Sequence, residues 1–85
     1  MEIIYSPRFA KSYKKLPARI KKIAEQKEAI FRNNPFDLRL KTHQLAGKLE
    51  GLLAFSINQK YRIIFEFSPD QKTVYFHQTG DHDIY

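Results

Sequence analysis

The sequence predicts an α+β fold in which an N-terminal strand and an α-helical hairpin precede an antiparallel β-meander. Between residues 7 and 33, apolar side chains recur at the spacing of one helix face. Between residues 51 and 79, apolar and polar side chains alternate, as they do along a half-buried strand. With 85 residues the chain is long enough for one domain, so we expect residues 1–85 to form a single domain.

The first expected element is a short strand over Met1–Tyr5, because isoleucine and tyrosine favour extended structure. Ser6 and Pro7 follow, and these residue types are typical of a helix N-cap and of the first helical position. Pro17 ends this first helix and begins the next. The apolar stripe of the first helix consists of Phe9, Tyr13 and Leu16.

The second helix runs to a stop at Asn33-Asn34-Pro35. Its opposite faces differ in character, since one is charged and the other apolar. The apolar face consists of Ile20, Ile23, Ala24, Ile30 and Phe31. Both helices therefore need an apolar surface to cover, and the C-terminal half of the chain can supply it.

Residues 36–50 contain loop signals, and three strands are expected after them. These strands are Gly51–Asn58, Tyr61–Phe67 and Thr73–Thr79. If the alternating apolar residues of the second strand face the helices, Arg62 and Glu66 face away. Arg62 then stands on an open face, where a guanidinium can hold a phosphate through two hydrogen bonds. The alternative is a surface arginine paired with Glu66, and local pattern does not decide between the two.

Composition narrows the class of protein. The chain has no cysteine, which excludes a disulfide framework and thiolate metal sites. No apolar run is long enough to cross a bilayer, and the N-terminal segment does not resemble a signal peptide. We therefore expect a cytoplasmic domain that does not span a membrane.

Charge gives the first indication of function. The formal net charge is +6, and residues 1–50 carry twelve basic and five acidic side chains, against three and four in residues 51–85. A basic half suggests an anionic partner such as nucleic acid, an acidic protein or a membrane surface. The alternative is that the charge serves solubility alone.

The side chains that could take part in catalysis indicate acid–base catalysis rather than a metal site. Asp81, His82 and Asp83 are adjacent in sequence and cannot easily converge on one ion, so no metal or cofactor is expected. Metal-free RNA cleavage needs a base, an acid and a cation, because the ribose 2′-OH attacks its own phosphate. The residues that could supply these groups are His43, Lys60, Arg62, His82 and Tyr85.

Two segments, KTHQLAGKLEGLLAFSINQKYRIIFEF and VYFHQTGDHDIY, resemble the RelE/ParE superfamily of bacterial toxins from toxin–antitoxin systems. The resemblance is strongest to the RelE and YafQ-like messenger-RNA interferases. It covers nearly the whole chain, through an H-x-L-x-G loop, a Y-R-I-I-F strand and a G-x-H tail with a terminal aromatic residue. It implies a fold similar to that of the microbial ribonucleases.

Carried over by position, the resemblance implies a catalytic set of His43, Arg62, His82 and Tyr85. His43 matches the loop histidine of YafQ-like toxins, Arg62 the phosphate-binding arginine, and His82 an acid–base histidine of the tail. The set is mixed, because Ser56, Lys60 and Gln78 stand where YafQ-like toxins have histidine, aspartate and arginine. The residues expected to contact RNA are Lys41, Lys48, Lys60, Tyr61 and Gln78.

The resemblance implies a toxin of a type II toxin–antitoxin system, of the kind associated with plasmid stabilisation. We expect it to cleave messenger RNA, on the ribosome, and so to inhibit translation. Its other expected partner is a cognate antitoxin, with the toxin monomeric when free and oligomeric with the antitoxin, and no membrane partner is expected. Two alternatives stay open: a ParE-like poison of DNA gyrase without nuclease activity, and a non-toxic relative that binds an antitoxin or nucleic acid.

Overall fold

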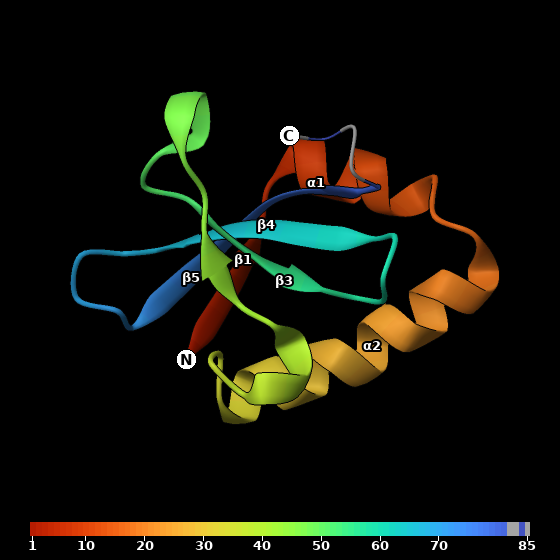
Figure 1. Cartoon of the computed structure of the whole chain (residues 1–85), viewed down its shortest axis with the longest axis horizontal. Helices are drawn as coiled ribbons and strands as arrows, with labels where there is room; N and C mark the ends of the chain where they lie inside the picture. Colours follow the sequence, from red (N-terminus) through yellow and green to blue (C-terminus); the bar gives the residue numbers. More distant parts are fainter. Residues whose placement is uncertain (82–83, 85) are drawn as a thin grey trace.

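The computed structural model describes residues 1–81 and 84, and its elements are drawn in Figure 1. The N-terminal half holds strand β1 (Glu2–Tyr5), helix α1 (Pro7–Lys14) and helix α2 (Ala18–Asn33). The middle of the chain forms the 3₁₀ turn η1 (Leu38–Leu40), strand β2 (His43–Gln44) and the 3₁₀ turn η2 (Gly47–Leu49). The last three strands are β3 (Leu53–Ser56), β4 (Arg62–Phe67) and β5 (Thr73–Gly80).

The strands form one mixed sheet in the order β1-β5-β4-β3-β2. Strands β2 to β5 pair antiparallel, which confirms the predicted meander and the α+β class. Strand β1 is added in parallel along β5, from Glu2 opposite Thr73 to Tyr5 opposite Phe76. The amide of Ser6 continues this pairing by donating to the carbonyl of Phe76 over 3.1 Å.

The predicted cap of α1 and the predicted start of α2 are confirmed, but α1 ends at Lys14 and not at Pro17. The amides of Lys15 and Leu16 bond to carbonyls three residues back, so Leu16 enters the core from the turn between the helices. The Ser6 side chain caps α1 by accepting a hydrogen bond from the amide of Phe9 at 3.0 Å, and Pro17 occupies the N-cap position of α2. Figure 1 shows the two helices joined by a sharp turn and diverging from it, so that the hairpin is an open V. Helix α1 is fastened to β5, because the amide of Thr79 donates to Ser12 Oγ over 3.1 Å.

One apolar core joins the helices to a single face of the sheet. Phe31 of α2 is fully buried at its centre, with ring centroids 4.8 Å from Phe55, 4.9 Å from Phe65 and 5.5 Å from Phe76. The stripes predicted for both helices and the alternation predicted for β3 and β4 all contribute to this core. Its members are Phe9, Leu16, Ile20, Ala24, Phe31, Leu40, Phe55, Ile57, Ile63, Phe65, Val74 and Phe76.

The structure differs from the sequence prediction in the middle of the chain. Strand β2 lies within the segment expected to be loop, because a two-residue strand is too short to show alternation. Strand β3 is shorter than the predicted Gly51–Asn58. At one end Gly51 has φ +93°, a left-handed conformation that a strand does not use. At the other end the Asn58 side chain accepts bonds from the amides of Lys60 and Tyr61 and turns the chain. In the described part of the chain, neither helix has the length and apolar character that a membrane span requires.

Candidate active site

The sheet face opposite the core carries two rows of side chains that run across the strands. Residues directly paired on neighbouring antiparallel strands point to the same face, so the register defines each row. The first row consists of Ser56, Arg62 and Gly80. The second row consists of His43, Ala54, Ile64 and Gln78. Arg62 and His43, which are distant in sequence, therefore lie in adjacent rows of one face, as the alternation of β4 predicted for Arg62.

Beside the first row, where β3 turns into β4, a cleft of about 440 Å³ opens toward α2. Its walls come from α2, from the segment around η1 and from the β3–β4 turn. The residues that line it are Ile23, Lys27, Arg39, Lys41, Ser56, Ile57, Asn58, Gln59 and Arg62. Four of these are cations and, among the described residues, none is acidic, so the cleft attracts anions.

The Arg62 guanidinium is held by backbone carbonyl groups of the β3–β4 turn. Its Nη1 donates to the carbonyl of Asn58 at 2.6 Å and to that of Tyr61 at 3.2 Å. Both bonds use Nη1, so the edge formed by Nε and Nη2 is the part of the guanidinium that can bind a phosphate through two parallel bonds. The turn therefore orients Arg62 for anion binding.

The alternative pairing of Arg62 with Glu66 is wrong, because Glu66 has another partner. Its Oε1 lies 2.8 Å from Nε2 of His77 on β5. Arg62 and Glu66 stand at opposite ends of β4, four residues apart, which separates their Cα atoms by about 13 Å in an extended strand.

Lys41 and His43 are coupled through the backbone. Nδ1 of His43 lies 3.1 Å from the carbonyl oxygen of Lys41, and a carbonyl can only accept, so Nδ1 carries the proton of this bond. In the neutral ring the lone pair is then on Nε2, which is the atom available as a base. Lys41 has the left-handed backbone angle φ +53°, which is uncommon for a residue with a side chain and directs its carbonyl toward His43.

The cations of the cleft are not equivalent. Arg39 binds Asp37 through two bonds, Nε to Oδ1 at 3.0 Å and Nη2 to Oδ2 at 2.9 Å. The bond from the Arg39 side chain, with a second from its backbone amide, holds the pKa of Asp37 at about 2. This pair is largely neutral as a unit. Lys27 donates from Nζ to the carbonyl of Arg39 at 3.3 Å, so an uncharged acceptor positions its ammonium group.

No protein-family model and no curated protein sequence matches the chain. Solved structures do match it. YafQ from E. coli strain BL21(DE3) aligns with a TM-score of 0.79 at 23% identity, over 98% of this chain and 94% of that one. A YoeB/ParE toxin from Agrobacterium tumefaciens aligns with a TM-score of 0.79 at 18% identity, over 96% and 99%. A chain of the RelBE2 toxin–antitoxin complex from Mycobacterium tuberculosis gives 0.75 at 20% identity, over 95% and 96%. The chain has the RelE/YafQ-type toxin fold.

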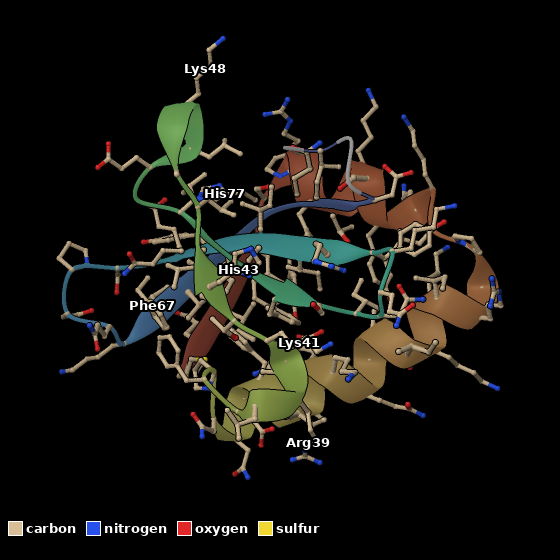
Figure 2. The ribbon with its side chains drawn as sticks, viewed as in Figure 1. Arg39, Lys41, His43, Lys48, Phe67 and His77 are labelled. Atoms are coloured by element: carbon tan, nitrogen blue, oxygen red, sulfur yellow. The ribbon has the colours of Figure 1, made fainter. Side chains whose placement is uncertain are left out.

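Within this RelE/YafQ-type fold, some of the expected RNA-contacting residues lie at the cleft or in the row of His43, and the others lie elsewhere. Lys41 lines the cleft, and Gln78 lies in the same row as His43. Lys48 lies on η2, which Figure 2 shows projecting away from Lys41 and His43. Lys60 lies on the β3–β4 turn with its ammonium group 5.5 Å from the centre of the Tyr61 ring, and Tyr61 itself packs against the core. His82 and Tyr85, the two tail residues of the expected catalytic set, lie outside the described residues.

Sequence reasoning missed three residues of this RelE/YafQ-type chain. Lys27 is one of many charges on the outer face of α2, and no local signal distinguishes it from its neighbours. The Asn58 carbonyl that orients Arg62 leaves no mark on the sequence. The proximity of His77 to Glu66 depends on the pairing of β4 with β5, which no local pattern in the sequence reveals.

Proposed function

We propose that this chain is the toxin of a type II toxin–antitoxin system and acts as a metal-independent endoribonuclease on messenger RNA. The observation that carries the proposal is the cationic cleft lined by Arg62 and Lys41, with His43 in the adjacent row of the same sheet face. A phosphodiester is the anion that such a site fits, because the guanidinium edge and the lysine ammonium group match its two unesterified oxygens. The likeness of the fold to the YafQ and YoeB/ParE toxins supports the same conclusion.

The proposed reaction is transesterification within the RNA chain. His43 Nε2 accepts the proton of the ribose 2′-OH, and the 2′ oxygen forms a bond to phosphorus as the bond from phosphorus to the 5′ oxygen breaks. A proton donor protonates the departing 5′ oxygen, so the products are a 2′,3′-cyclic phosphate and a 5′-hydroxyl end. Arg62, with Lys41 and Lys27, stabilises the charge that develops on the phosphoryl oxygens.

His82 is the donor that we propose, with Tyr85 next in order. This assignment rests on the resemblance of the G-x-H tail to that of YafQ-like toxins. Its test is single-turnover cleavage from pH 5 to 9 by wild type and by His82→Gln. If His82 is the proton donor, the fall in rate at high pH seen for wild type should be absent in His82→Gln. An unchanged pH profile excludes this role.

The proposed partners are the ribosome with its messenger RNA, and a cognate antitoxin. Structures of the same fold have been determined in toxin–antitoxin complexes, including RelBE2 from M. tuberculosis. With a net charge of +6, the chain suits an acidic partner that covers the cleft and thereby blocks RNA. We place its site of action in the cytoplasm, where its substrate is translated.

The test is expression of the protein in growing bacteria, followed by mapping of RNA 5′ ends and of their chemistry. New cleavage sites in messenger RNA with 5′-hydroxyl ends support the proposal. Ends that carry a 5′-phosphate would indicate metal-assisted hydrolysis and refute the mechanism. No new ends, together with inhibition of DNA supercoiling by purified gyrase, would identify a ParE-like poison.

Two variants, each of which lacks one positive charge, distinguish a specific role of the cleft from a general effect of surface charge. Arg62→Ala is expected to abolish cleavage and growth inhibition, since removal of one preorganised charge donor typically lowers a rate about 10²- to 10³-fold. Lys72→Ala is the matched control, because Lys72 precedes β5 at the far end of the sheet from Arg62. Arg62→Lys keeps the charge but not the two-bond geometry, and circular dichroism establishes that each variant is folded. Equal activity of Arg62→Ala and Lys72→Ala would refute the site.

A further inference from the structure

A second depression, of about 450 Å³, lies on the same sheet face as Arg62 but apart from the cationic cleft. It is bounded by the start of α1, by the segment around η2 and by strands β4 and β5. The residues that line it are Ser6, Pro7, Arg8, Leu49, Leu52, Ile64, His77 and Gln78. None of them lines the cationic cleft, so the two sites are separate parts of one surface.

The depression has an apolar floor. Ile64 is only 2% exposed although it points away from the helical core, and Leu49 and Leu52 reach over the sheet beside it. An apolar floor with a few polar groups at its rim is the usual form of a small-molecule site. A flat heteroaromatic ring has the matching character, with apolar faces and polar atoms at its edge. The polar groups here are Arg8, His77 and Gln78.

An irregularity in β5 brings two of these rim residues together. Gln78 pairs with Ile64 and Phe76 pairs with Phe65, so His77 is an extra residue between two consecutive pairs. Such a bulge redirects a side chain that regular alternation would send to the other face. As a result His77 and Gln78, although adjacent in sequence, both line the depression.

The rim residues are held in place by the surrounding structure. The Glu66 carboxylate accepts from His77 Nε2 at 2.8 Å, which leaves Nδ1 of the neutral ring as an acceptor. The backbone of His77 is tied to the N-terminus of α1, because Ser6 Oγ donates to the His77 carbonyl at 3.0 Å. In its neutral form His77 offers a fixed acceptor, while Gln78 offers a donor and an acceptor, and Arg8 a set of donors. This combination matches the edge of a nucleobase.

We propose that this depression binds a nucleobase of the RNA whose scissile phosphate lies at Arg62. The inference deepens the proposed ribonuclease function and rests on it for the identity of the substrate. The spacing is suitable, since Ile64 and Arg62 are two residues apart on β4, which is roughly 7 Å along a strand. That separation is short enough for a base and the phosphate next to it to occupy the two sites together.

A binding experiment tests the site without requiring any cleavage. The intact protein is titrated separately with the four nucleosides, which lack phosphate, and with inorganic phosphate, and NMR signals are followed. The nucleosides should shift the Ile64 methyl and the Gln78 side-chain amide signals, and phosphate should shift those of Arg62 and Lys41 instead. The proposal is overturned if no nucleoside shifts the Ile64 and Gln78 signals, or if the shifts are no larger than those around Lys72.

Two matched glutamine variants complete the test. Gln78→Ala should weaken nucleoside binding about 3- to 10-fold, the effect of losing one or two hydrogen bonds of ordinary strength. Gln26→Ala, on the exposed face of α2, should leave binding unchanged. Equal binding by both variants overturns the assignment of Gln78.

Cleavage mapping then separates this inference from the proposed function. If wild type cuts RNA with a base preference that Gln78→Ala relaxes, both are supported. If wild type cuts RNA and Gln78→Ala keeps the same preference and rate, the nucleobase site is rejected while the ribonuclease stands. Nucleoside binding without any RNA cleavage supports the site and rejects the ribonuclease.

Discussion

Substitution of the cleft cations should change the way in which RNA binding depends on salt. Lys27, Lys41 and Arg62 line the cleft, and their three positive charges can neutralise up to three phosphate charges of a bound strand, those of the scissile phosphate and its neighbours. For single-stranded nucleic acid, the slope of log affinity against log salt changes by roughly 0.7 for each phosphate neutralised. The slope for the triple alanine variant should therefore be smaller in magnitude than the wild-type slope by about 2.

This loss has a large measurable consequence. Between 50 and 200 mM salt the concentration rises fourfold, so a slope of about 2 corresponds to roughly a 20-fold change in affinity. Wild type should thus weaken about 20-fold more than the triple variant over this interval. Arg39 is left intact in this design, because it is already paired with Asp37 and its removal would expose that carboxylate to the cleft.

The assay is fluorescence anisotropy with a labelled single-stranded RNA that carries 2′-O-methyl groups and cannot be cleaved. Single variants at the three cleft positions are compared with Lys72→Ala, which removes the same charge from the other end of the sheet. The reasoning is refuted if Lys72→Ala lowers the slope as much as each cleft variant does. It is also refuted if the triple variant retains the wild-type slope, which would mean that the basic surface acts without a defined site.

Three further outcomes are expected. His43→Ala should lower single-turnover cleavage by about 10²- to 10⁴-fold with little change in RNA affinity, as measured by rapid quench, and an equal loss of affinity would contradict its role as the base. Phe31→Ala should reduce the free energy of unfolding by about 3–5 kcal/mol in urea denaturation, because the ring is fully buried among three phenylalanines, and a loss below about 1 kcal/mol would contradict this packing. The pKa of Asp37 is lowered from 3.8 to about 2, so its ion pair with Arg39 stabilises the fold above pH 3.8 and is lost as the pH falls toward 2. Stability measured across this window should therefore fall less in Asp37→Asn than in wild type, and parallel curves would contradict the shift.

Local sequence was enough to predict the elements that carry the core. Ser6 and Pro7 predict the start of α1, and Pro17 predicts the start of α2. The alternation around Phe65 predicts which face of β4 is buried. These signals work because capping, proline geometry and side-chain period are all properties of a few neighbouring residues. The same period places Arg62 on the opposite face, so its orientation could also be read from the sequence.

Features that depend on a partner strand could not be read in this way. The pairing of β1 with β5 joins segments about seventy residues apart, and nothing within Glu2–Tyr5 indicates a parallel neighbour. The bulge at His77 exists only in the register between β4 and β5, so the sequence alone does not show that this side chain meets Glu66. The alternative pairing of Arg62 with Glu66 failed for the same reason, since Glu66 finds its partner across the strands rather than along its own.

The candidate site also combines features that the sequence predicts with features that only the tertiary structure shows. The sequence by itself determined which residue types are present and, through resemblance, predicted that His43 and Arg62 belong to one functional set. Only the tertiary structure decided that Lys27 of α2 reaches the cleft of Lys41 and Arg62, and that Nδ1 of His43 is tied to a carbonyl. Convergence of this kind is set by the packing of Phe31 and its neighbours, which fixes α2 against the sheet. Packing is a property of the whole core, whereas the sequence pattern reports each element separately.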